Sequence, residues 1–237
     1  MNARPDSDDP ALLALPLELP EPFPEFPEGE FEYSAEEELW NALSHGLGLV
    51  LALTGFPFLV GQYLERGGLA LLGACVFGGA AVLVYLSSTL YHALPAGRFK
   101  RFFRTLDHTA IFLLIAGTYT PFTLGVMRGG AGWALFGVVW TIALLGSLAK
   151  IWRGPFSGSL SLGLYLAAGW SIFLVGRTAL ELIPLQAIAW LLAGGAFYTI
   201  GIVFFRWEAL RHNHFVWHLF VIGGTSCHFV AVYNYAA

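Results

Sequence analysis

Long apolar stretches separated by short polar breaks are the dominant pattern of this chain. A helix needs about 20 predominantly apolar residues to cross the hydrocarbon core of a bilayer. Seven stretches of that length are predicted as spans, at about 42–64, 68–94, 106–127, 131–152, 157–176, 182–205 and 214–237. The pattern therefore predicts an all-α fold, an integral membrane bundle of seven transmembrane helices within residues 36–237.

Composition supports this interpretation. Of the 237 residues, 57% are apolar and only 12% are charged, whereas a soluble domain has roughly 25% charged residues. These values exclude an ordinary water-soluble fold. Cys75 and Cys227 both lie inside apolar runs, so we expect them to be packing residues and not part of a disulfide framework.

The beginning of the chain has a different character. Residues 1–38 hold 12 of the 16 acidic residues and a single basic residue, Arg4. Acidic, proline-rich segments do not bury enough apolar surface to fold, so residues 1–35 are predicted to form a disordered tail. Ser34 followed by Glu37 is typical of a helix N-terminus, and the acids of that first turn are expected to form a solvated charged face.

The distribution of Lys and Arg among the short loops predicts the orientation. The loops after spans two, four and six carry eight of these residues, and those after spans one, three and five carry three. Because cytoplasmic loops are enriched in Lys and Arg, we expect a cytoplasmic N-terminus, an external C-terminus and residence in the plasma (inner) membrane. Retinal proteins are excluded, because the only lysines, Lys100 and Lys150, lie at the inner boundary.

Polar side chains inside the predicted spans are the candidate functional groups. Placing an ionisable side chain inside a membrane costs free energy, so such residues mark functional sites by default. Five of them are predicted to lie in the cytoplasmic leaflet: Ser88 and His92 in span two, Asp107 in span three, and His214 and His218 in span seven. The spacing of four residues places His214 and His218 on one helix face, and Ser88 and His92 share that spacing.

Two histidines from one helix and a third from another form a three-nitrogen set, which leaves the fourth position of a tetrahedral zinc ion for water. The negative charge of Asp107 would help to balance the ion. A di-iron centre needs several carboxylates, so a single Zn²⁺ is the preferred interpretation. His108 is either an outer partner of the site or an interface residue, and His45 is either a packing residue or an outer hydrogen-bond partner. His228 lies about 15 Å from His218 by helical rise and is not expected to bind the same ion.

At these residues the chain resembles the haemolysin III family, the bacterial branch of the progestin and adiponectin receptor superfamily. The motifs are Ser88-xxx-His92, Asp107 and His214-xxx-His218, and the resemblance covers about residues 36–237. It implies a zinc ion held by His92, His214 and His218, with Asp107 and Ser88 contacting the water or the ligands. It also implies a relation to membrane hydrolases that include alkaline ceramidases.

The leading hypothesis is therefore a zinc-dependent hydrolase that cleaves a lipid amide or ester with metal-activated water at the cytoplasmic leaflet. Asp107 would position that water and accept its proton, and Ser88 would stabilise the oxyanion or orient His92. A membrane sensor with a structural zinc is the alternative, and a haemolysin-type pore or transporter ranks below it. The expected partners are membrane lipids and not nucleic acids, and the sequence does not determine an oligomeric state.

Overall fold

A computed structural model describes residues 33–153 and 158–236, and within this part of the chain every regular element is helical. The predicted all-α fold is thus confirmed. The helices are α2 (Ala35–Tyr63), α3 (Gly68–Ala93), α4 (Arg98–Leu124), α5 (Gly130–Arg153), α6 (Gly158–Gly169), α7 (Gly176–Leu182), α8 (Leu185–Phe205) and α9 (Asn213–Tyr235). Short 3-10 helices, η1 (Leu64–Arg66) and η2 (Ser171–Val175), lie between them. Most of the predicted tail, residues 1–32, lies outside the described residues.

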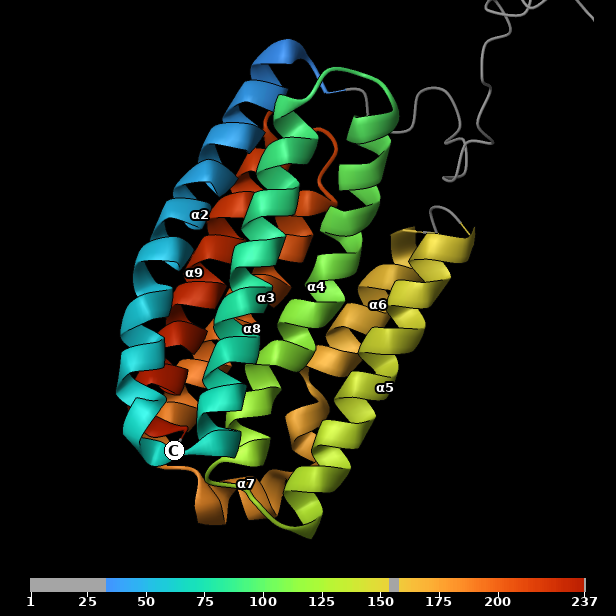
Figure 1. Cartoon of the computed structure of the whole chain (residues 1–237). Coiled ribbons are helices and arrows are strands. Elements are labelled where there is room, and N and C mark those ends of the chain that lie inside the picture. The colour runs from blue at the N-terminus through green and yellow to red at the C-terminus, as the bar shows by residue number, and fades with distance from the viewer. Residues whose placement is uncertain (1–32, 154–157, 237) are drawn as a thin grey trace, which may run out of the picture.

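The long helices run up and down along one bundle axis (Figure 1). Helix α3 packs between α2 and α4, and α9 packs against α2, α4 and α8. Helix α2 begins at one end of the bundle and the C-terminus lies at the other (Figure 1). As a result, four helix ends meet at the same end of the molecule: the beginnings of α2, α4 and α9 and the end of α3.

The first helix begins where the sequence predicted. The Ser34 hydroxyl accepts a hydrogen bond from the Glu37 backbone N–H at 3.3 Å, and the Glu37 carboxylate accepts one from the Ser34 backbone N–H at 2.9 Å. These reciprocal bonds satisfy two N–H groups that have no partner within the helix. The capping box is therefore confirmed, and it fixes the position of the first turn of α2.

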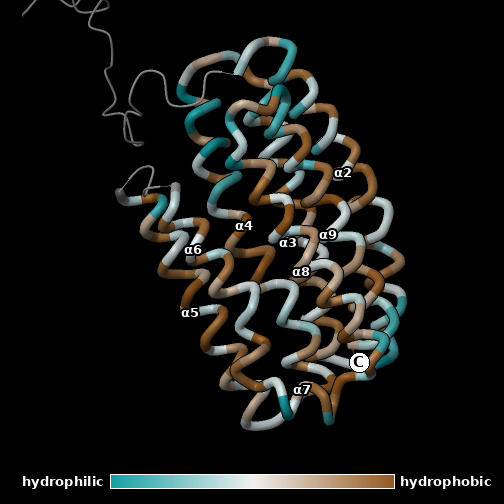
Figure 2. The backbone as a smooth tube through the Cα atoms, turned by 180° about the vertical axis from the view of Figure 1, so that it is seen from behind, coloured by the Kyte–Doolittle hydropathy of each residue, from teal (hydrophilic) through white to brown (hydrophobic). Residues whose placement is uncertain are grey.

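Six helical segments are long and apolar enough to cross a membrane, judged by length and composition over the described residues: Ala35–Arg66, Gly68–Ala93, Gly130–Trp152, Ser159–Leu182, Leu185–Phe205 and Asn213–Tyr235. Helix α4, the third predicted span, is not among them. Its first turns carry Arg98, Lys100, Arg101 and Arg104, which lower its hydropathy. Figure 2 shows hydrophilic residues gathered at the end of the bundle where α2 begins, with hydrophobic residues along the helices. The count of seven spans and the orientation stay predictions.

The fifth predicted span is a broken helix. Helix α6 ends at Gly169, η2 follows, and α7 begins at Gly176. A break at membrane depth is tolerated where neighbouring groups satisfy the freed backbone atoms. The Tyr119 hydroxyl of α4 does so, because it donates to the Gly169 carbonyl at 2.5 Å and accepts from the Ile172 N–H at 3.1 Å. The break is thus tied to α4.

Candidate metal centre

Three histidines from two helices meet at the end of the bundle where α2 begins. His92 lies in the last turn of α3, and His214 and His218 lie in the first two turns of α9. One ligand atom from each lies within 4.8 Å of the other two, and all three residues are buried. The ring centroids of His214 and His218 are 4.4 Å apart, and that of His92 is 5.0 Å from the first and 5.2 Å from the second. This three-histidine group can hold a metal ion.

The nitrogen atoms of this group are suited to an ion. His92 Nε2 and both ring nitrogens of His214 are buried and have no hydrogen-bond partner among the described residues. A buried polar atom without a partner costs about 1–3 kcal/mol, and a metal bond removes that cost. The donor set, with three neutral nitrogens, matches catalytic zinc sites.

Asp107 and Ser88 lie beside one another near these histidines. Both are buried, with 7% of Asp107 and 0% of Ser88 exposed, and the Ser88 hydroxyl lies near the Asp107 carboxylate. Over the described residues, the group of possible metal ligands comprises the three histidines and does not include Asp107. The assignment of Asp107 to the water and not to the metal stays a prediction.

The two further candidate histidines occupy different positions. His45 of α2 stacks on His218, with ring centroids 3.5 Å apart and an interplanar angle of 14°, and its two nitrogens are buried with no hydrogen-bond partner in the described part of the chain. The His108 backbone carbonyl accepts a hydrogen bond from Tyr165 at 2.8 Å. Neither histidine belongs to the three-ligand group, so any role beside the metal stays a hypothesis.

Sequence reasoning missed Glu38. We expected the acids of the first turn to form a solvated face, and for Glu38 that expectation was wrong, because its side chain is only 17% exposed. Its carboxylate lies 2.5 Å from His92 Nδ1 and 2.8 Å from the ammonium of Lys100. The available signal was the spacing of Glu38, Asn41 and Ser44, which places all three on one face of α2.

Tyr33, two residues before α2, packs against two of the three histidines. Its ring centroid lies 5.0 Å from that of His214 and 5.9 Å from that of His92. Burial raises the pKa of the Tyr33 hydroxyl, and the nearby Tyr91 adds to that effect, so the tyrosine is neutral at physiological pH. The ring therefore contacts His92 and His214 without adding charge to the site.

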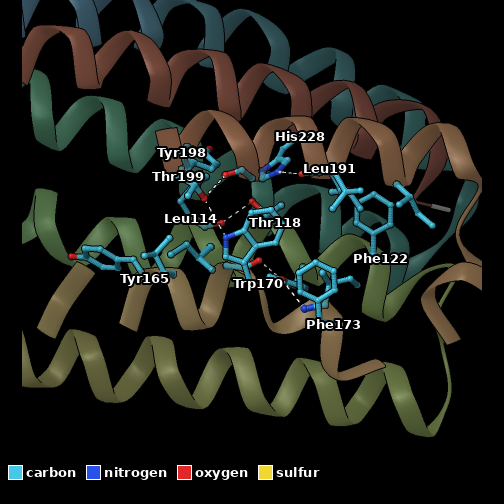
Figure 3. Close-up of a pocket in the computed structure, with 18 of the residues that line it drawn as sticks. Leu114, Thr118, Phe122, Tyr165, Trp170, Phe173, Leu191, Tyr198, Thr199 and His228 are labelled. Atoms are coloured by element: carbon cyan, nitrogen blue, oxygen red, sulfur yellow. Dashed lines mark hydrogen bonds between the residues drawn. The ribbon is translucent and has the colours of Figure 1, made fainter. Parts of the chain in front are cut away.

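An apolar cavity of about 280 Å³ lies deeper in the bundle, between α3, α4, α6, η2, α7, α8 and α9 (Figure 3). Its lining reaches to within one helical turn of the polar site, because Val84 lies four residues before Ser88 and Ile111 lies four residues after Asp107. Trp217, next to His218, also lines it. The cavity and the histidine group are thus adjacent.

The cavity also reaches the outer surface of the bundle. Phe173 of η2 and Leu180 of α7 line it and are 67% and 66% exposed. The few hydrogen-bonding groups around it are mostly paired with protein, as between Trp170 and Thr199 at 3.2 Å (Figure 3). Exposed apolar side chains of η2 and α7 therefore form part of the cavity wall.

Comparison with known families decides the classification. A family model described as haemolysin-III related matches residues 33–229, which is most of the 237-residue chain. The chain belongs to the haemolysin III family. The resemblance stated from the Ser-xxx-His, Asp and His-xxx-His motifs is confirmed. As a member of this family, the chain is a multi-pass membrane protein.

Relatives extend across most of the chain. It is 39% identical over 201 residues to Hemolysin-3 of Bacillus cereus, covering 84% of this chain and 92% of that one. It is 35% identical over 205 residues to the Hemolysin-3 homolog of Bacillus subtilis (strain 168), covering 86% and 96%. The monocyte to macrophage differentiation factor of Homo sapiens is 25% identical over 219 residues, covering 87% of each chain. These similarities place the haemolysin III family in the progestin and adiponectin receptor superfamily.

Proposed function

We propose that this protein is a zinc-dependent membrane hydrolase that cleaves an amide or ester bond of an acyl lipid, at the cytoplasmic leaflet of the plasma membrane. One observation carries the proposal: three buried histidines that can hold a metal ion, two of them with nitrogens that have no partner among the described residues, lie beside Ser88 and Asp107, which are one helical turn from the lining of an apolar cavity. The histidines supply a site for a metal ion, and the cavity supplies space for a hydrocarbon chain.

Zinc is the proposed ion because of the donor set. Three neutral imidazoles leave one coordination position open, which is the arrangement of catalytic zinc sites such as the three-histidine type. When bound, the ion supplies a Lewis acid that polarises a carbonyl oxygen and lowers the pKa of water to about 7. His92, His214 and His218 would hold it, each through one ring nitrogen.

Asp107 is the proposed proton acceptor. It is the carboxylate buried nearest to Ser88 in the first turns of α4, and it also offsets positive charge in a site with little water. A general base of this kind contributes typically 10²- to 10⁴-fold to the rate. Ser88 would donate a hydrogen bond to the oxygen on which negative charge develops.

The cavity supports an acyl lipid as substrate. Ligand pockets are mostly apolar and enclose roughly 300–1,000 Å³, and the volume here, about 280 Å³, lies just below that range. A lipid passing between α7 and α8 would place its chain beside Tyr165, Trp170 and Leu191 (Figure 3). The carbonyl of the bond to be cleaved would then lie one helical turn closer to the end of the bundle where α2 begins, beside Ser88 and Asp107.

The test is release of fatty acid from a panel of acyl lipids by the purified full chain in mixed micelles. We expect turnover of at least one amide or ester, and its loss in His214→Ala. The matched control is His212→Asn, which removes a histidine outside the metal-ligand group and keeps a residue type that tolerates the positive φ of 58° at that position. Zinc binding without turnover of any lipid would instead support a sensor and contradict the hydrolase.

A further inference from the structure

The carboxylate of Glu38 bridges a histidine of the candidate metal centre and a lysine from another part of the chain. One oxygen lies 2.5 Å from His92 Nδ1, and the other lies 2.8 Å from Lys100 Nζ. We propose that Glu38 is a positioning residue, which holds the His92 ring so that Nε2 faces the metal. The inference rests on the proposed zinc site and assigns an outer partner to one of its ligands.

The two nitrogens of His92 have opposite surroundings. Nδ1 contacts the carboxylate, whereas Nε2 is buried with no hydrogen-bond partner among the residues that the structure describes. A carboxylate accepts a hydrogen bond from an N–H, so Nδ1 carries the proton and Nε2 offers its lone pair. Metal-binding histidines commonly have such a partner, which fixes the tautomer and the ring orientation and makes the ligand more basic.

Lys100 holds the carboxylate in place. Its ammonium donates to the backbone carbonyls of Tyr91 at 2.8 Å and Leu94 at 3.1 Å, as well as to Glu38. Tyr91 lies in the last turn of α3, which also carries His92, and Leu94 directly follows that helix, so the lysine joins α2, the end of α3 and the start of α4. Glu38 and Lys100 are 17% and 20% exposed, which limits how far water weakens the pair.

Helix α2 also supplies partners for His218. His218 Nδ1 lies 2.9 Å from the Ser44 hydroxyl and 3.2 Å from the Asn41 backbone carbonyl. One face of α2 thus supplies the Nδ1 partners of two of the three histidines. In both histidines the contact is to Nδ1, which leaves Nε2 for the metal. This repeated arrangement supports a role for α2 in orienting the ligands.

The experiment compares metal binding by the full chain and its variants Glu38→Ala, Glu38→Gln and Glu36→Ala. Glu36→Ala is the matched control, because Glu36 is a carboxylate in the same turn that pairs with Arg211 at 2.8 Å and is 55% exposed. Three quantities are measured: zinc affinity in competition with a chelator, the visible absorption spectrum with Co²⁺ as a probe of ligand geometry, and thermal stability with and without metal.

We expect Glu38→Ala to weaken zinc affinity by roughly 10- to 100-fold, to change the Co²⁺ spectrum, and to reduce the rise in melting temperature caused by zinc. Glu38→Gln should lie between it and the parent chain, since its amide oxygen accepts the same hydrogen bond without the charge. This variant also carries the test if Glu38→Ala does not fold. Parental affinity and spectrum in both Glu38 variants would overturn the inference and leave the proposed function intact, whereas a parent chain that binds no metal would overturn both.

Discussion

At the scale of single residues, the buried groups around the candidate centre divide between those with protein partners and those without. His218 Nδ1 and His92 Nδ1 have partners on α2, whereas His92 Nε2 and both nitrogens of His214 have none among the described residues. Because buried polar atoms are nearly always hydrogen-bonded, the second set marks where an ion, water or substrate is expected.

Asp107 allows a test of this division. In Asp107→Asn the side chain keeps its size but loses its negative charge and its basicity. We expect zinc to stay bound, with turnover lowered by about 10²- to 10⁴-fold, the usual cost of a lost general base. Metal content and rate are measured on the same preparation. An Asp107→Asn chain purified without zinc would make Asp107 a ligand, and one with full turnover would exclude it as the base.

The site residues that the sequence could predict were those that belong to a short motif with four-residue spacing. The four-residue spacings and the shared membrane depth suffice to predict that His92, His214 and His218 lie close together, with Ser88 one turn below His92. Glu38 was missed because its partner lies 54 positions away, and three consecutive acids at a helix start usually face solvent. Only the packing of α2 against α3 reveals the contact.

At the scale of elements, helix boundaries deviated from the predicted spans for identifiable reasons. Helix α4 begins at Arg98, eight residues before the predicted span, because its charged first turns are helical without being apolar. The predicted span 157–176 is interrupted after Gly169, where Tyr119 compensates the free backbone groups. Hydropathy measures how readily a segment partitions into lipid. It therefore detects neither the charged helical start of α4 nor the break after Gly169.

Close contact between α3 and α4 depends on a glycine. A Cβ atom built at Gly73 would lie 2.6 Å from Pro121 Cα, a backbone atom that cannot rotate away. We expect Gly73→Ala to force α3 and α4 apart and to cost about 1–3 kcal/mol, as overpacking does. Gly79→Ala, on the same helix, is the control, because nothing lies within 4 Å of its Cβ position. Thermal unfolding in detergent measures both, and equal melting temperatures would contradict the proposed packing.

At the scale of the whole molecule, the bundle places an apolar cavity directly beneath a polar end. The polar end contains the beginnings of α2, α4 and α9 (Figure 1). Residues of α6, η2 and α7 line the cavity. The sequence predicted the polar cluster. It did not predict the cavity, because side chains from seven separate helical elements, α3, α4, α6, η2, α7, α8 and α9, form its lining. The orientation in the membrane remains the prediction made from the loop charges.

The central claim is that His92, His214 and His218 hold one metal ion, and elemental analysis of the purified full chain tests it most directly. Without chelators, we expect about one zinc per chain, and a loss of most of that zinc in each of His92→Ala, His214→Ala and His218→Ala. The control His212→Asn should keep the parental content. Zinc near zero in the parent chain, or unchanged zinc in all three alanine variants, would contradict the account.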